Sequence, residues 1–212
     1  MTRSLTAAAL GLGLLACAPQ QYRLEMDGAG AIYTDLLPDH VDVPGPSADP
    51  IALPIEVVID ESVQHARWEA VIDADRIRLP VGEELATHLD DVVLAVFPQA
   101  KISSRRAMLD RSLLRARVVA VERTLPHLGN GVAMPFHRTT IVVEWRFEDP
   151  SGRLIWLDTV TASAEQDPAE KPNPRRAMLA RLFSELYAES LRRLDQSVEV
   201  RAFAARYTPP SS

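Results

Sequence analysis

The chain has 212 residues, a formal net charge of −6, 47% hydrophobic residues and a single cysteine, Cys17. One cysteine excludes a disulfide within the chain and a cysteine-rich zinc site, so a hydrophobic core must stabilise the fold, and the chain is long enough to bury one. The acidic balance, without a strong basic cluster, argues against nucleic acid as the main partner.

The N-terminus has the features of a secretion signal. Met1–Ser4 carries one positive charge, and Leu5–Leu15 is an uncharged run made mostly of leucine, alanine and glycine. A short positive region followed by an apolar run of about 7–15 residues and small residues is typical of such a signal. The run is shorter than the roughly 20 apolar residues that span a bilayer, and charges interrupt every later apolar stretch. We therefore expect export.

The end of this run resembles the lipobox of bacterial lipoproteins. It reads Leu14-Leu15-Ala16-Cys17. The resemblance implies cleavage before Cys17, a diacylglyceryl group on its thiol and a third acyl chain on its amine; two or more chains anchor a protein stably. The alternative is an ordinary signal peptide cut after Ala18, but Pro19 would then follow the cut, and signal peptidases resist proline there.

The residue after the cysteine bears on the destination. In the best-known lipoproteins an aspartate at this position retains the protein at the inner membrane, and this chain has Ala18 instead. The resemblance therefore implies an outer-membrane lipoprotein that faces the periplasm, with the inner membrane as the alternative.

The composition after the cysteine predicts a tether and one domain. Proline and glycine are frequent up to Pro50, and proline-rich linkers stay extended. We expect a signal peptide at 1–16, the lipidated cysteine and a proline-rich tether at 17–50, a single α+β periplasmic domain at 51–205, and a disordered tail at 206–212.

The first half of the domain predicts strands and then a helix. Ile51–Ile59 is short and β-branched, and a second strand is expected around Arg67–Ile72 or Ile77–Leu79. The sequence predicts a helix over residues 82–97, because apolar side chains recur there at helical spacing. These are Leu85, Leu89, Val92, Val93 and Val96.

The second half predicts a meander followed by a long helix. Ser112–Val121 alternates as a strand, with Val119 and Val121 expected on the same face as the arginines at 115 and 117. Thr139–Phe147 and Leu154–Thr161 predict a hairpin around an Asp-Pro-Ser-Gly turn. A helix with an apolar stripe is expected from Pro174 or the next residue to about 198. The three tryptophans, Trp68, Trp145 and Trp156, are expected to pack in the core.

These elements predict an α+β fold, a two-layer sandwich with a mainly antiparallel sheet covered by two amphipathic helices. The layout over residues 50–200, with the helical segment Leu79–Pro98, resembles a group of small proteobacterial lipoproteins. The group includes poorly characterised outer-membrane lipoproteins, auxiliary lipoproteins of lipid-transporting ABC systems, and the lipoprotein partner of the lipopolysaccharide-assembly barrel. The resemblance implies an accessory or scaffold role in envelope transport or assembly, and it brings no catalytic residues with it.

No motif for catalysis or for a cofactor is present. The sequence has no H-E-x-x-H pair, no G-x-S-x-G elbow and no phosphate loop. His127 and His137 could meet across a loop, but two ligands make a poor zinc site. We therefore expect no enzyme activity, no cofactor and no metal. The alternative is a periplasmic hydrolase or small-ligand-binding protein whose site is assembled from distant residues.

One segment reverses the acidic charge of the chain. Between Lys101 and Arg123 the basic residues outnumber Asp110 and Glu122. Because arginine binds phosphate in a bidentate manner, five side chains are candidates for contact with lipid headgroups, lipopolysaccharide phosphates or an acidic protein partner. These are Arg105, Arg106, Arg111, Arg115 and Arg117. Alternatively, the arginines cover a solvated sheet face and pair with Glu144 and Glu148 across strands.

Overall fold

The computed structural model describes residues 34–35, 37–38, 40–72, 75–103, 105–124, 138–167, 169 and 174–207. Cys17, the signal and most of the expected tether therefore lie outside the described residues. The strands are β1 (Thr34–Asp35), β2 (Ile55–Ile59), β3 (Trp68–Ile72), β4 (Asp75–Leu79), β5 (Lys101–Ser103), β6 (Ser112–Thr124), β7 (Arg138–Glu148) and β8 (Leu154–Glu165). The helices are α1 (Glu61–Gln64), α2 (Val81–Val96), α3 (Pro174–Gln196) and α4 (Val198–Arg206).

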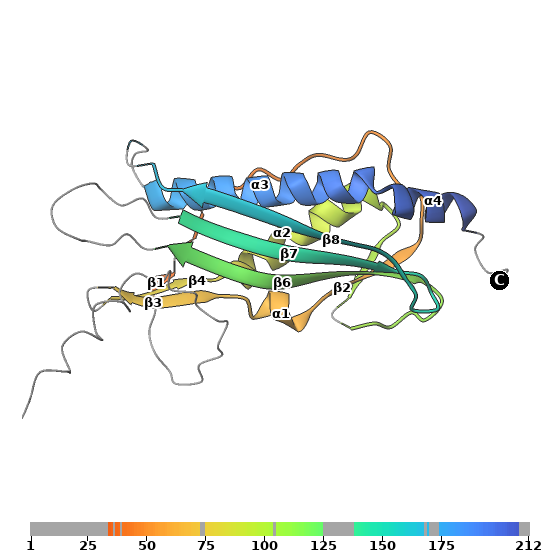
Figure 1. The fold of residues 1–212 in the computed structure, drawn as a ribbon, viewed down its shortest axis with the longest axis horizontal. Helices are drawn as coiled ribbons and strands as arrows, with labels where there is room; N and C mark the ends of the chain where they lie inside the picture. Colours follow the sequence, from red (N-terminus) through yellow and green to blue (C-terminus); the bar gives the residue numbers. More distant parts are fainter. Residues whose placement is uncertain are drawn as a thin grey trace, which may run out of the picture.

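A five-stranded sheet in the order β5-β2-β6-β7-β8 forms one layer (Figure 1). Strands β6, β7 and β8 are the expected antiparallel meander, whereas β2 runs parallel to both β5 and β6. The hairpin turns where it was expected, and Gly152 takes a positive φ of 85° that a side chain would disfavour. The α+β fold is confirmed, with a mixed sheet.

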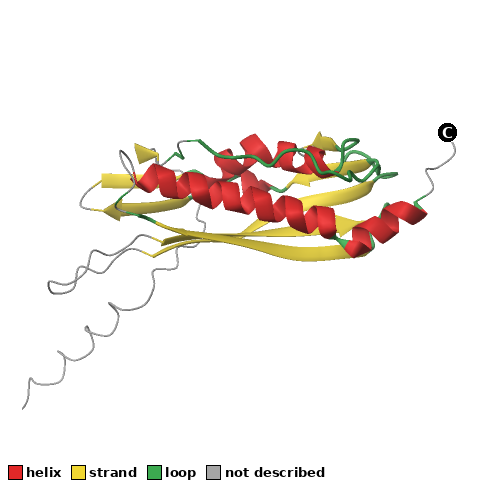
Figure 2. Cartoon of the chain, turned by 90° about the horizontal axis from the view of Figure 1, so that it is seen from above, coloured by secondary structure: helices red, strands yellow, loops and turns green. Residues whose placement is uncertain are grey.

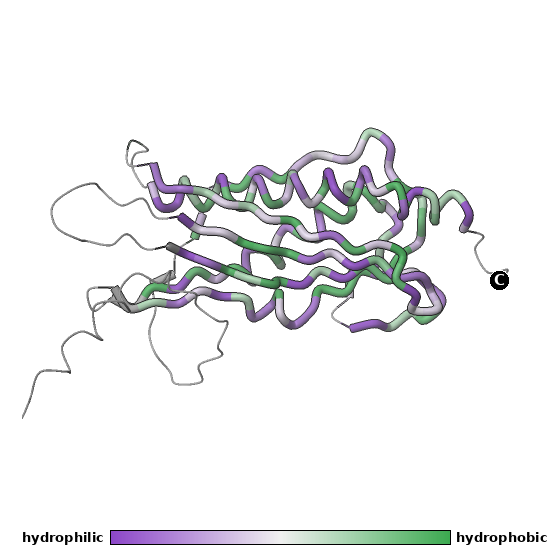
Figure 3. Tube along the Cα trace, viewed as in Figure 1, coloured by the Kyte–Doolittle hydropathy of each residue, from purple (hydrophilic) through white to green (hydrophobic). Residues whose placement is uncertain are grey.

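Helices α2 and α3 form the second layer on one face of the sheet (Figure 2). Hydrophobic and hydrophilic residues alternate along α3, as its amphipathic pattern predicts (Figure 3). Its apolar stripe packs on the inward residues of β7, including Trp145 and Phe147, which are fully buried. All three tryptophans are buried, which confirms their expected place in the core.

The C-terminal helix is longer in total than expected, and it is broken. Ser197 separates α3 from α4, and its hydroxyl accepts a hydrogen bond from the Val200 N–H, which caps the new helix. Val198, the expected helix end, is instead the first residue of α4. Among the described helices, none is both long and apolar enough to cross a bilayer.

Strand β6 contains a bulge that the sequence pattern does not reveal. Val118 pairs with Val143 and Ala120 pairs with Val142, so Val119 is left without a partner in the register. One extra residue turns every later side chain to the opposite face. The prediction that Val121 shares the outer face with the arginines is therefore wrong, because Val121 is buried in the core.

A small sheet in the order β1-β4-β3 lies beside the large one, and the β3–β4 hairpin occupies both places where a second strand was expected. Short helix α1 packs against the start of α2 at Gly82, where an added Cβ would lie 2.0 Å from the Val63 carbonyl oxygen. The closeness of the two backbones explains why glycine is needed there.

Residues 40–50, which the sequence assigns to the tether, lie along the helical layer in the structure. The Ser47 N–H donates to the Ala95 carbonyl, and the Asp42 N–H donates to the Ser184 hydroxyl. Val41 is buried among the core residues. This stretch therefore packs on the domain before β2 begins.

Candidate functional site

The arginines of the basic segment lie on two different parts of the structure, the β5–β6 connection and strand β6. Arg105, Arg106 and Arg111 lie on the connection between β5 and β6, which crosses β2 because β5 and β6 flank that strand. Arg115 and Arg117 follow on β6, on the face of the sheet away from the helices. Three of the five candidates therefore lie on a connection and two lie on a strand.

A buried carboxylate fixes the crossing connection. Glu56, on β2, is 1% exposed and accepts hydrogen bonds from the N–H groups of Ala107 (2.7 Å) and Met108 (2.9 Å). The Ser103 hydroxyl donates to the same carboxylate at 2.9 Å. Burial alone would raise the pKa of Glu56, but these hydrogen bonds together with the charge of Arg106 hold the pKa below its usual value. Glu56 therefore stays ionised and holds the basic connection over the sheet.

The arginines of this side have different surroundings. The Arg106 guanidinium donates to the Pro150 carbonyl at 3.3 Å, and Arg105 is exposed. Arg117 is 55% exposed and lies 3.4 Å from the Glu144 carboxylate across the strands. Glu148, the other acid expected to pair with the segment, is bound by Arg146 of its own strand instead. Arg105 is therefore available to bind an anion, whereas the charge of Arg117 is partly balanced by Glu144.

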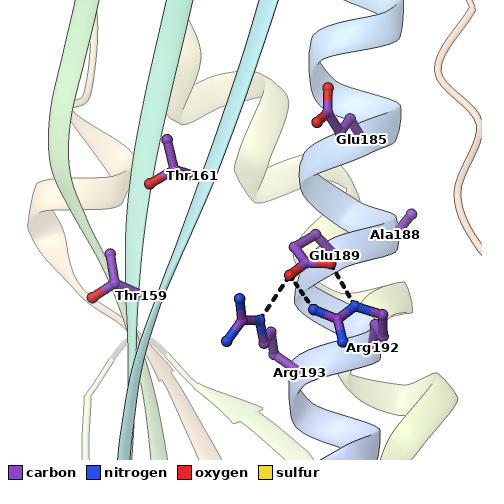
Figure 4. Close-up of a pocket in the computed structure, with 7 residues that line it drawn as sticks. All are labelled: Thr159, Thr161, Glu185, Ala188, Glu189, Arg192 and Arg193. Carbon is purple, nitrogen blue, oxygen red and sulfur yellow. Dashed lines mark hydrogen bonds and ion pairs between the residues drawn. The ribbon is translucent and has the colours of Figure 1, made fainter.

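An open groove of about 510 Å³ lies between α3 and the edge strand β8 (Figure 4). Thr159 and Thr161 line it from the strand, and Glu189 lies on the helix side. Figure 4 shows the Glu189 carboxylate between two guanidinium groups, Arg192 and Arg193, with nitrogen–oxygen distances of 2.5–2.7 Å. The charges of the groove are thus largely paired with one another.

The two arginines beside Glu189 determine the protonation state of its carboxylate. Hydrogen bonds from Arg192 and then Arg193 lower the pKa of Glu189 to about 2. Arg193 also reaches Asp158 on β8 at 3.1 Å, which links the helix to the sheet edge. A carboxylic acid that donates a proton near neutral pH needs a raised pKa, so Glu189 is suited to binding α3 to the sheet and not to acid catalysis.

A second titratable cluster joins the two helices. The Tyr187 hydroxyl donates to the Glu84 backbone carbonyl at 2.9 Å, and His88 meets the Tyr187 ring edge-on at 5.6 Å between centroids. Burial raises the pKa of Glu84, and His88 lies 3.6 Å from its carboxylate. The Tyr187 hydroxyl thus joins α3 to α2, and this cluster stabilises the packing of the two helices.

The remaining candidates do not come together. Within the described ranges, no group of three or more histidine, cysteine, aspartate or glutamate side chains is placed to hold a metal ion. His127 and His137 lie outside the described residues, as does Cys17. One residue of the basic segment that was not a candidate, Arg123, is turned into the interior by the bulge at Val119 and is 2% exposed. No pattern in the sequence marks that bulge.

Comparison with known proteins places the fold. No protein-family model matches the chain, and no curated protein sequence is significantly similar to it. A crystal structure of a Xanthomonas campestris protein of the DUF330 family matches with a TM-score of 0.51 at 16% identity, over 82% of this chain and 99% of that one. The chain therefore shares the fold of that protein.

Two lipoproteins match less closely. Rare lipoprotein B from Shewanella oneidensis gives a TM-score of 0.38 at 14% identity, over 72% of this chain and 99% of that one. A minor lipoprotein from Acinetobacter baumannii gives 0.39 at 16% identity, over 67% and 93%. The expected resemblance in fold is confirmed by the Xanthomonas campestris structure alone.

Proposed function

We propose that the protein is a lipid-anchored, non-enzymatic accessory lipoprotein of the bacterial envelope. It is held by acyl chains on Cys17 in the outer membrane, faces the periplasm, and binds an envelope transport or assembly complex or lipid. The observation that carries the proposal is the Leu14-Leu15-Ala16-Cys17 sequence at the end of a signal-like apolar run. The shared fold with a DUF330 protein is compatible with it.

The contact surface in this proposal is the basic side of the domain. Arg105 and Arg117 are exposed there, and the Glu56 hydrogen bonds keep the connection that carries Arg105 in place. Guanidinium groups bind phosphate and carboxylate groups with two parallel hydrogen bonds, so this side suits a headgroup or an acidic protein surface. The paired acids of the β8–α3 groove favour a binding protein over a hydrolase.

The anchor is tested by labelling and fractionation. The full-length protein, expressed in a Gram-negative host fed an alkyne fatty acid, should carry label and float with the outer membrane. Cys17→Ala should lose both, and Ala18→Asp should keep the label but move to the inner membrane. Because Cys17 is the only cysteine, label on the thiol has one place to go. Outer-membrane fractionation of unlabelled Cys17→Ala would refute the anchor.

The accessory role is tested by crosslinking in the envelope. The wild-type protein should recover a defined membrane complex or lipid. The Arg105→Glu, Arg117→Glu double variant should recover about tenfold less, because two exposed ion pairs contribute up to about 1 kcal/mol each. The matched control is Arg192→Glu on the groove side, which should leave recovery unchanged. Equal recovery by the double variant would remove the basic side from the proposal.

A further inference from the structure

Arg123 is a buried cation for which the described part of the chain provides no counter-ion. Arg123 of β6 is 2% exposed, and its Nε and Nη1 atoms have no hydrogen-bond partner among the described residues. The guanidinium carbon lies 4.8 Å from the centre of the Trp68 ring, so the group is stacked on the indole face. The guanidinium therefore contacts the indole, while Nε and Nη1 remain without a hydrogen-bond partner among the described residues.

Among the described residues, the charge that acts on Arg123 is also positive. Burial, together with the nearby charge of Arg175 on α3, lowers the pKa of Arg123 to about 10, and the group stays charged at neutral pH. A buried charge that lacks a partner is strongly unfavourable, so an anion from elsewhere is the expected partner.

A second unused group lies opposite this arginine. Thr139 of β7 pairs with Arg123 across the sheet, is fully buried, and its hydroxyl has no partner among the described residues. The next pair, Thr124 with Arg138, closes the β6–β7 ladder, and Arg138 is exposed. The two unused groups therefore lie one residue pair from the end of the sheet, which is the end where α3 begins (Figure 1).

We propose that Arg123 and Thr139 form an internal binding site for a phosphate group, with Arg175 as a second cation. Two guanidinium groups and a hydroxyl donor suit the several oxygens and the charge of a phosphate better than a single carboxylate. The positive end of α3 adds to the attraction. The phosphate is either the free inorganic ion or the headgroup of an acidic lipid.

This inference goes beyond the proposed function and does not depend on the anchor. Thermal unfolding of the purified full-length protein in a non-ionic detergent is followed with inorganic phosphate, with short-chain phosphatidic acid, and with the matching uncharged diacylglycerol. At least one phosphate ligand should raise Tm with increasing concentration, and diacylglycerol should not. The ligand that binds more tightly, inorganic phosphate or phosphatidic acid, identifies whether the site takes the free ion or a lipid headgroup.

The variants separate a ligand site from a structural arginine. Arg123→Met should remove the phosphate-dependent rise and, by deleting an unpaired buried charge, should leave the ligand-free Tm unchanged or higher. Thr139→Val keeps the shape of the side chain and should weaken phosphate binding about tenfold. The control is Arg206→Met, an exposed arginine at the end of α4, which should respond as wild type.

Three outcomes would overturn the proposal. The first is a wild-type Tm that none of the phosphate ligands changes. The second is a phosphate response that persists in Arg123→Met. The third is a ligand-free Arg123→Met that is much less stable than wild type, which would show that Arg123 has a partner within the chain. Thr139→Val tests the site without removing the arginine, and its phosphate affinity must fall for the proposal to stand.

Discussion

The hydrogen bonds of Glu56 should be a major source of stability for the sheet. Glu56→Ala leaves the N–H groups of Ala107 and Met108 without their acceptor at 2.7 and 2.9 Å. A hydrogen bond to a charged group contributes about 1.5–3 kcal/mol, so losing two that share one carboxylate should cost about 3–5 kcal/mol. With a urea m-value of about 2 kcal/mol/M, the unfolding midpoint should fall by about 2 M.

The measurement is urea unfolding of the purified full-length chain, followed by tryptophan fluorescence. Glu122→Ala is the matched control, because Glu122 is an exposed acid in the neighbouring strand, and its change should stay within about 0.5 kcal/mol. Glu56→Gln keeps one oxygen acceptor and should fall between the two. A Glu56→Ala midpoint equal to that of the control would show that the connection is held by other contacts.

The same carboxylate has a pH signature with a definite sign. The pKa of Glu56 is lower in the folded chain than its usual value, so its stabilisation is fully present at neutral pH. It is lost as pH falls below the usual glutamate pKa of 4.5 and through the lower pKa of the folded chain. Glu56→Gln should therefore lose less stability on acidification than wild type, and parallel pH curves for the two proteins would contradict the assignment.

Three further predictions follow from single contacts. Gly82→Ala should destabilise the fold by about 3 kcal/mol, because the new Cβ meets the Val63 carbonyl and backbone cannot rotate away; an unchanged Tm would show that α1 can move. Tyr187→Phe should cost about 1 kcal/mol in urea unfolding by losing its hydrogen bond to the Glu84 carbonyl, and no loss would mean that the bond is not formed in solution. In a carboxyl NMR titration, Glu189 should titrate at about 2. A midpoint above 4 would show that its two arginines are solvated. Because the carboxylate is partly exposed, Glu189→Gln should change the free energy of unfolding by less than about 1 kcal/mol.

Local patterns were sufficient for much of the fold. The apolar stripe of α3, the alternation in β7 and the turn at Gly152 each depend on residues close together in the chain, and the structure has all three. The burial of the tryptophans follows from the same alternation. The lipobox at Cys17 is a local signal too, but it lies outside the described residues and stays a prediction.

The two layers, the meander and the amphipathic helices could be predicted from the sequence, because apolar residues recur every two residues in the strands and about every 3.6 in the helices. The tertiary structure alone decided that β2 lies between β5 and β6, since parallel pairing joins segments far apart in the chain. It also decided, through one unpaired residue at Val119, that Arg123 points into the interior while Arg117 stays outside. A bulge is a property of the pairing between two strands, and neither strand alone shows where it falls.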